Sequence, residues 1–150
     1  MPDLELHEIE NEVVARITAQ VPGISAKAAD SIDADHRWLV QSTPAVLVVC
    51  EEETMLGVPN QPLSNKCGIY NVPVRLVFFF TGMRPRGDGR VPGNELLADV
   101  RDALYNYWIN PGTQSPLNYL GLGGRDYDEK ERKLLMTQLY ETRVVREAII

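Results

Sequence analysis

The sequence contains few of the residues that build disulfide frameworks and metal centres. Of its 150 residues, two are cysteines and two are histidines. Neither Cys50 nor Cys67 has a second cysteine at metal-ligand spacing, and two cysteines do not make a disulfide framework, so we expect two reduced thiols. The segment His7-Glu8-Ile9-Glu10 lacks a second histidine one turn later. It therefore does not match a helical zinc-protease motif.

Signals for membranes and for secretion are also missing. The most apolar stretch, Val72 to Phe80, is interrupted by Pro73 and Arg75 and is far too short to cross a bilayer as a helix. Residues 1–5 have neither the basic region nor the apolar region of a secretion signal. These absences predict a cytosolic protein without a membrane partner.

Basic residues are in the minority. The chain has 15 lysines and arginines and 21 aspartates and glutamates, which gives a net charge of -6 and a pI of about 4.9. A protein that coats nucleic acid usually carries a basic stripe, whereas the mean field of this chain repels phosphate. The length and the 44% hydrophobic content instead suit one compact domain over residues 1–150.

Sequence motifs for catalysis are absent as well. The chain has no Gly-x-Ser-x-Gly elbow, and neither cysteine has a basic or histidine neighbour in the sequence that would activate it. Gly121-Leu122-Gly123-Gly124 contains Gly-x-Gly, but no Gly-Lys-Ser/Thr follows and the next segment is acidic. We therefore expect no catalytic, cofactor-binding or metal-binding residues, and no cofactor.

Two apolar stripes at helical spacing are present. The first predicts a helix that ends at Pro22-Gly23, and its members are Leu6, Ile9, Val13, Ile17 and Val21. The second predicts a helix from the N-cap residue Asn94 to Asn110-Pro111-Gly112, and its members are Leu97, Val100, Leu104 and Trp108.

Three segments are typical of strands. Pro44 to Cys50 is a β-branched run of the kind that is buried on both faces, and Cys67 to Phe80 is a longer strand with one apolar face. Pro73 places this long strand on a sheet edge or at a bulge. Leu134 to Glu147 is a last strand without a cleanly apolar face, which suits a second chain covering one side.

The remaining segments are weakly patterned. Trp38-Leu39-Val40 is interpreted as a short strand, and Leu117 to Gly124 is turn-rich with room for another. Ala148-Ile149-Ile150 is apolar, which also suggests docking against a partner. The order of helix, strand, strand, helix, strand predicts an α+β fold, in which a single mixed or antiparallel β-sheet carries two helices packed on one face.

Charged loops are the candidate contact sites. Arg84, Arg86 and Arg90 lie on one predicted loop of an otherwise acidic chain, and Glu51-Glu52-Glu53 follows a predicted strand. The default interpretation of both segments is a solvated connection. If they function, arginines would pair with carboxylates on a neighbouring subunit, or with DNA phosphates. We predict that the two segments form complementary patches in a head-to-tail contact.

The run of elements resembles the tail terminator proteins of long-tailed bacteriophages, in the lambda-like and Mu-like families. The resemblance covers most of the chain without a short diagnostic motif. It lies in the helix Leu4–Val21, the strand Thr43–Val49, and the long strand Val72–Phe80 that leads through a loop into the helix Asn94–Leu104, with a trailing strand.

The resemblance implies a structural virion protein and no enzyme. Terminators form a ring, a homohexamer, that caps the tail tube at its head-proximal end, stops polymerisation and presents a surface for head–tail joining. The partners so implied are other copies of the chain, the tail tube protein, the sheath in contractile tails, and the neck protein. DNA would pass through the lumen without specific binding.

Three other roles fit the residues. A neck or head-completion protein shares the size and acidity of a terminator, and its lack of catalytic motifs. A small enzyme that uses aspartates and glutamates would need a clustered carboxylate site. A stand-alone binding module would remain monomeric.

Overall fold

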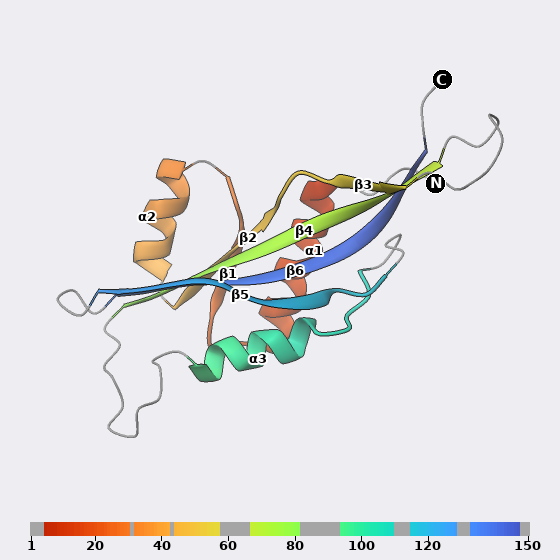
Figure 1. The fold of residues 1–150 in the computed structure, drawn as a ribbon. Helices are drawn as coiled ribbons and strands as arrows, with labels where there is room; N and C mark the ends of the chain where they lie inside the picture. Colours follow the sequence, from red (N-terminus) through yellow and green to blue (C-terminus); the bar gives the residue numbers. More distant parts are fainter. Residues whose placement is uncertain are drawn as a thin grey trace.

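The computed structural model describes residues 5–30, 32–42, 44–57, 67–81, 94–109, 115–128 and 133–147. Figure 1 shows these residues as a twisted sheet with helices on both sides. In chain order the elements are α1 (Leu6–Gln20), β1 (Ser25–Ala28), α2 (Ile32–Ser42), β2 (Ala45–Cys50), β3 (Thr54–Gly57), β4 (Cys67–Thr81), α3 (Asn94–Leu104), β5 (Asn118–Asp128) and β6 (Lys133–Glu147).

The described strands form one mixed sheet, so the predicted α+β fold class is confirmed. Its order is β1-β2-β4-β6-β5, with β3 also paired to β4. β1 runs parallel to β2, and α2 makes the crossover between them, whereas every other described pair is antiparallel. β4 and β6 form the centre of the sheet, paired along their whole length from Cys67 opposite Glu147 to Thr81 opposite Lys133.

The main core lies between the sheet and the helices α1 and α3. Because side chains alternate across a strand, every second residue of β4 and β6 points to these helices. These positions are buried, and they are Val72, Val74, Leu76, Phe78 and Phe80 on β4 and Leu134, Met136, Gln138, Tyr140, Thr142 and Val144 on β6. Ile9, Val13 and Ile17 of α1 and Val100 and Leu104 of α3 close the other side. The two predicted helices thus share this face.

A third helix, α2, corrects the interpretation of Trp38-Leu39-Val40 as a strand. It packs on the opposite face of the sheet, where Leu39 forms a small second core with Ala45 and Leu47 of β2. The two helices predicted from the sequence share the first face, as expected, and α2 is an additional helix on the second face. On this side Leu39 is buried and Trp38 packs against the same small core. The helix has 11 residues, against 15 in α1, so its apolar pattern is shorter than the stripe that reveals α1.

The helix α3 is shorter than predicted, because it ends at Leu104 and not at Asn110. Asn106 has a φ of 61°, a left-handed conformation that asparagine tolerates and that turns the chain away from the helix. Trp108 consequently leaves the predicted stripe and is 54% exposed. Arg16 of α1 donates from Nε to the carbonyl oxygen of Ala103 at 3.0 Å, which satisfies part of the helix end.

Pro73 lies on a central strand and not on an edge strand. Its carbonyl oxygen accepts a hydrogen bond from Glu51 N at 2.9 Å, so the nitrogen of Pro73 also faces the side of β4 that pairs with β2 and β3. The β2 pairing stops at Val74 and the β3 pairing starts at Asn71. The proline therefore occupies the gap between two partners, where the ladder needs no N–H donor.

Candidate interaction surface

The second face of the sheet is only partly covered. α2 packs on β2 and on the adjacent part of β4, where it meets Val77 and Phe79. The neighbouring face of β6 carries Leu135, Thr137, Leu139, Glu141 and Arg143, which alternate with the core residues of that strand. Leu135 is 41% exposed, although β6 has a neighbouring strand on each side. In the part of the chain that the structure describes, no helix lies over these residues.

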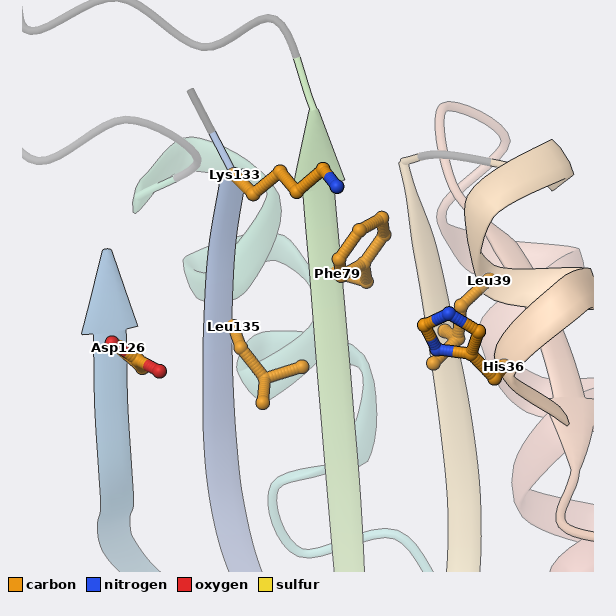
Figure 2. A pocket seen from close by; sticks show the side chains of 6 residues that line it. All are labelled: His36, Leu39, Phe79, Asp126, Lys133 and Leu135. Atoms are coloured by element: carbon orange, nitrogen blue, oxygen red, sulfur yellow. The ribbon is translucent and has the colours of Figure 1, made fainter. Parts of the chain in front are cut away.

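A hollow marks the border between α2 and the uncovered face, and its volume is about 270 Å³. Figure 2 shows its lining side chains, which come from α2, β4, β6 and β5. Leu39, Phe79 and Leu135 supply apolar surface, whereas His36, Asp126 and Lys133 supply ionisable groups around it. The hollow combines an apolar floor with a charged rim, as the anchor pockets of protein interfaces do.

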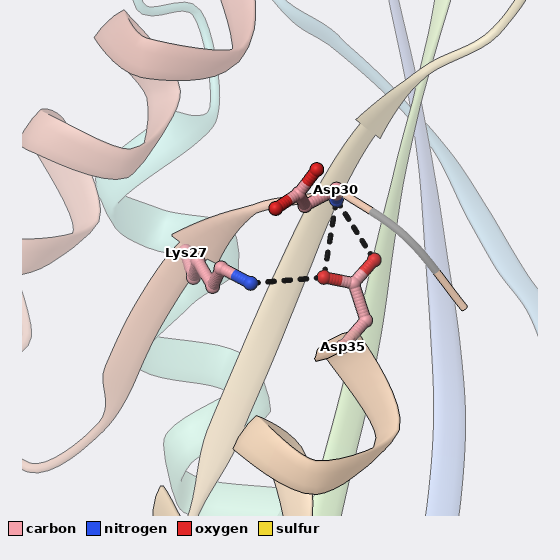
Figure 3. Close-up of polar contacts among 3 residues, drawn as sticks. All are labelled: Lys27, Asp30 and Asp35. Atoms are coloured by element: carbon pink, nitrogen blue, oxygen red, sulfur yellow. Dashed lines mark hydrogen bonds and ion pairs between the residues drawn. The ribbon is translucent and has the colours of Figure 1, made fainter. Parts of the chain in front are cut away.

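A polar cluster holds α2 in position beside this hollow. Figure 3 shows Asp35, in the first half of α2, turned toward β1. Its Oδ1 accepts hydrogen bonds from Lys27 Nζ and from Asp30 N, both at 3.0 Å, and its Oδ2 lies 2.8 Å from Asp30 N. The Asp35 side chain is 12% exposed, so these contacts are shielded from water. His36 and Leu39 are thereby fixed relative to the sheet.

Of the predicted site residues, the structure describes the three glutamates that follow β2. Glu51 forms an ion pair with Arg75 of β4, with 2.6 Å between Oε1 and Nη2, so its carboxylate already has a partner within the chain. Glu52 is exposed and Glu53 is half-buried on the connection between β2 and β3. Arg84, Arg86 and Arg90 lie outside the described residues. Their predicted contact with the three glutamates therefore stays a prediction.

The residues around the hollow were not predicted from the sequence as a site. Phe79 and Leu135 belong to the mixed faces of their strands, and only the register, which places them opposite each other, brings them side by side. His36 and Leu39 reach the hollow because residues 32–42 are helical. The available signal was the apolar character of Phe79 and Leu135 on faces that are otherwise partly polar.

Two side chains in the interior, Cys50 and Tyr140, have raised pKa values. Burial raises the pKa of the Cys50 thiol from its ordinary value of 9.0 to about 12, and the carboxylate of Glu10 adds to the shift. A thiol of this kind is a poor nucleophile at neutral pH. Burial also raises the pKa of the Tyr140 hydroxyl, so it stays protonated and donates to Gln138 Oε1 at 2.8 Å. Gln138 Nε2 in turn donates to the carbonyl oxygen of Leu97 at 3.0 Å.

The described residues contain neither a cluster of metal ligands nor a membrane-spanning helix. Over the described ranges, no three side chains of histidine, cysteine, aspartate and glutamate gather as a metal site requires. Within the same ranges, no helix has the length and apolarity needed to cross a membrane.

No protein-family model and no curated protein matches this chain. Among solved structures, the chain is similar to one described as "Virion of native gene transfer agent (GTA) particle". The two are 15% identical, the match covers 88% of this chain and 93% of that chain, and the TM-score is 0.42.

Proposed function

We propose that this chain is a non-catalytic structural protein of a bacteriophage virion, and that it acts as a tail terminator. It would form a ring, a homohexamer, on the head-proximal end of the tail tube, stop tube polymerisation and provide the surface for head–tail joining. The sequence resemblance to tail terminators supports this role. The observation that carries it is the half-covered second face of the sheet, where Leu135 of the central strand β6 is 41% exposed.

Such a face suits a protein that is completed by its neighbours. A sheet normally buries an apolar face against another layer, and an apolar patch left in water marks an interaction site. Other large exposed side chains include Tyr105 and Trp108, which follow α3, and Leu122 of β5, which lines a hollow together with Leu97 and Arg101 of α3. A ring subunit needs two different contact surfaces, because each copy touches one neighbour on either side.

The free edges of the sheet fit the same role. β1, β3 and β5 each pair with one neighbour only in the described sheet. β5 is irregular, since its register shifts between Tyr119 and Gly121 and again between Leu122 and Gly124. Irregular edge strands resist uncontrolled pairing with other chains, which a protein that forms a closed ring and no filament requires.

The partners of this role are also proposals. They are other copies of the chain, the tail tube protein, the sheath protein of a contractile tail and the neck protein. DNA would pass through the ring lumen without sequence-specific contact, in keeping with the acidic charge of -6. The mature location would be the virion, after synthesis in the host cytoplasm.

The test combines mass measurement with tail tubes polymerised from the tube protein of the same phage. We expect either a closed oligomer over a concentration series or a monomer that assembles on the tube ends. Electron microscopy should show the protein at one end of each tube, and its addition should stop growth of tubes supplied with fresh subunits. A monomer that binds no tube would refute the proposal, and binding to assembled heads alone would favour a neck or head-completion protein.

A further inference from the structure

Trp108 is an exposed tryptophan on a firmly held stretch of backbone. Its side chain is 54% exposed, whereas the next residue, Ile109, is buried in the main core. The residue before it, Tyr107, donates from its backbone N–H to the Leu104 carbonyl oxygen at 3.0 Å and accepts from Leu117 N at 2.8 Å. Because this backbone is already anchored on both sides of the indole, little conformational entropy is lost when a partner covers the ring.

An exposed tryptophan of this kind is a typical anchor of a protein interface. Tryptophan is enriched among the few residues that carry most of the binding energy, and such residues fill pockets in the partner. The hollow beside α2 offers such a pocket, with apolar surface from Leu39, Phe79 and Leu135. Its volume of about 270 Å³ lies below the roughly 300–1,000 Å³ of sites that enclose drug-sized ligands, which favours a single large side chain as the occupant.

The polar groups of the two surfaces are also complementary. An indole carries one N–H donor, which usually finds an acceptor when the ring is buried. Asp126 is exposed at the rim of the hollow, and its carboxylate can accept this hydrogen bond. Figure 2 shows Asp126 and His36 on opposite sides of the apolar floor. A tryptophan that enters between them would therefore bury its ring and pair its N–H.

Trp108 and the hollow beside α2 lie at different ends of one subunit. The backbone next to Trp108 is bonded to Leu117, and the following residue, Asn118, pairs with Glu141 of β6. Leu135 of the hollow precedes Glu141 by six residues on this strand, which is about 20 Å at roughly 3.3 Å per residue. Figure 1 also shows α2 and α3 on opposite sides of the sheet. A contact between Trp108 and the hollow therefore joins two copies.

We propose that Trp108 of one copy docks in the hollow formed by α2, β4, β5 and β6 of the next copy, with its indole against Phe79 and Leu135 and its N–H directed to Asp126. The contact is heterologous, since the two surfaces differ, and such a contact closes into a ring when the rotation permits. This inference deepens the proposed function, because it rests on self-assembly and names the two surfaces that would join neighbours in the ring.

Complementation between two variants tests the contact. Trp108→Ala removes the anchor, and Leu135→Asn places a polar side chain in the hollow. Far-UV circular dichroism and urea unfolding first confirm that both variants fold. We expect each variant alone to lose self-association at least about tenfold in sedimentation over a concentration series. An equimolar mixture should form a heterodimer, because the intact Trp108 of one variant meets the intact hollow of the other. The heterodimer should grow no further, since its two remaining surfaces are both altered.

Two further variants are matched controls. Leu135→Met keeps an apolar side chain in the hollow, and Leu120→Ala truncates a leucine that is 53% exposed on β5. Both should associate as the unaltered protein does. For a protein that assembles only on tail tubes, the same loss, recovery and controls are measured as binding to tube ends.

Fluorescence gives an independent readout. The chain has two tryptophans, so Trp38→Phe leaves Trp108 as the only one and keeps an aromatic ring in the small core of α2. On association in solution, the emission of Trp108 should shift to shorter wavelength and its quenching by acrylamide should fall. This measurement uses neither Trp108→Ala nor Leu135→Asn, so it tests the contact even if one of these variants does not fold.

Several outcomes overturn the contact. They are unchanged association of Trp108→Ala, a mixture that does not recover pairs, and an emission of Trp108 that is the same in the monomer and in the assembly. If Trp108→Ala still caps tubes and stops their growth, only the contact fails. If the heterodimer forms but the unaltered protein binds no tube, the contact stands and the terminator role fails.

Discussion

The hydrogen bonds of Gln138 give a quantitative test of how α3 is attached to the sheet. Gln138 is buried in the main core, where it accepts from the Tyr140 hydroxyl and donates to the Leu97 carbonyl of α3. Tyr140→Phe leaves Gln138 Oε1 without this donor, and a buried polar group without a partner costs about 1–3 kcal/mol. Gln138→Leu deprives the hydroxyl of its acceptor and also breaks the bond to Leu97, so we expect about 2–4 kcal/mol.

The double variant should be less damaging than the two single changes added together. With leucine at Gln138 and phenylalanine at Tyr140, both members of the side-chain pair are apolar and only the bond to Leu97 is lost. We expect the double variant to lose about 1–2 kcal/mol, which leaves a coupling of at least about 1 kcal/mol. Independent sites add to within roughly 0.3–0.5 kcal/mol, so the difference is measurable.

Urea unfolding followed by far-UV circular dichroism measures these free energies. All four proteins are compared at one low concentration, because self-association would otherwise add to the apparent stability. Additive losses in the double variant would mean that the Gln138–Tyr140 bond contributes nothing to the folded state, and the reasoning on the buried network would then be wrong.

Three further predictions concern other parts of the sheet. Asp35→Ala should destabilise the fold by about 1–3 kcal/mol in urea, because Lys27 and a backbone N–H lose their shared acceptor, whereas Asp35→Asn should lose less. Gly123→Ala would place a Cβ 3.0 Å from Leu139 Cγ, so we expect a loss of about 1–2 kcal/mol that Leu139→Ala partly restores. With its pKa raised to about 12, the Cys50 thiol should react with a thiol reagent at pH 8 at least tenfold more slowly in the folded than in the unfolded chain. Because the unfolded thiol ionises near 9.0 and the folded thiol near 12, its stabilising effect is present below pH 9 and should decline as the pH rises through that window.

The elements with a strong periodic pattern were predictable from the sequence. The stripe of Ile9, Val13 and Ile17 identified α1, and the β-branched run Ala45–Cys50 identified β2. The long strands β4 and β6 were also found, to within one residue at each end. In these segments local preference and burial agree, so the pattern is sufficient.

The other elements depend on contacts that local patterns do not report. β5 contains Gly121, Gly123 and Gly124, which favour turns, yet it pairs with β6 through two shifts in register. Gly121 has a φ of 125°, a conformation that glycine adopts easily, so the residues that suggested a turn make the irregular strand feasible. The helix α2 was not predicted, because its contact with β2 is confined to a small core around Leu39. The hollow was therefore not predicted either, since His36 and Leu39 of α2 line it.

The position of β6 in the sheet has a consequence for the time course of folding. β6 follows β1, β2, β4 and β5 in the chain, but it lies between β4 and β5 in space. Neither of those strands has its main partner until β6 has been synthesised, and pairing between distant segments is slow. During translation the growing protein must keep an incomplete sheet from associating with other chains, so assembly has to wait until the central ladder has closed.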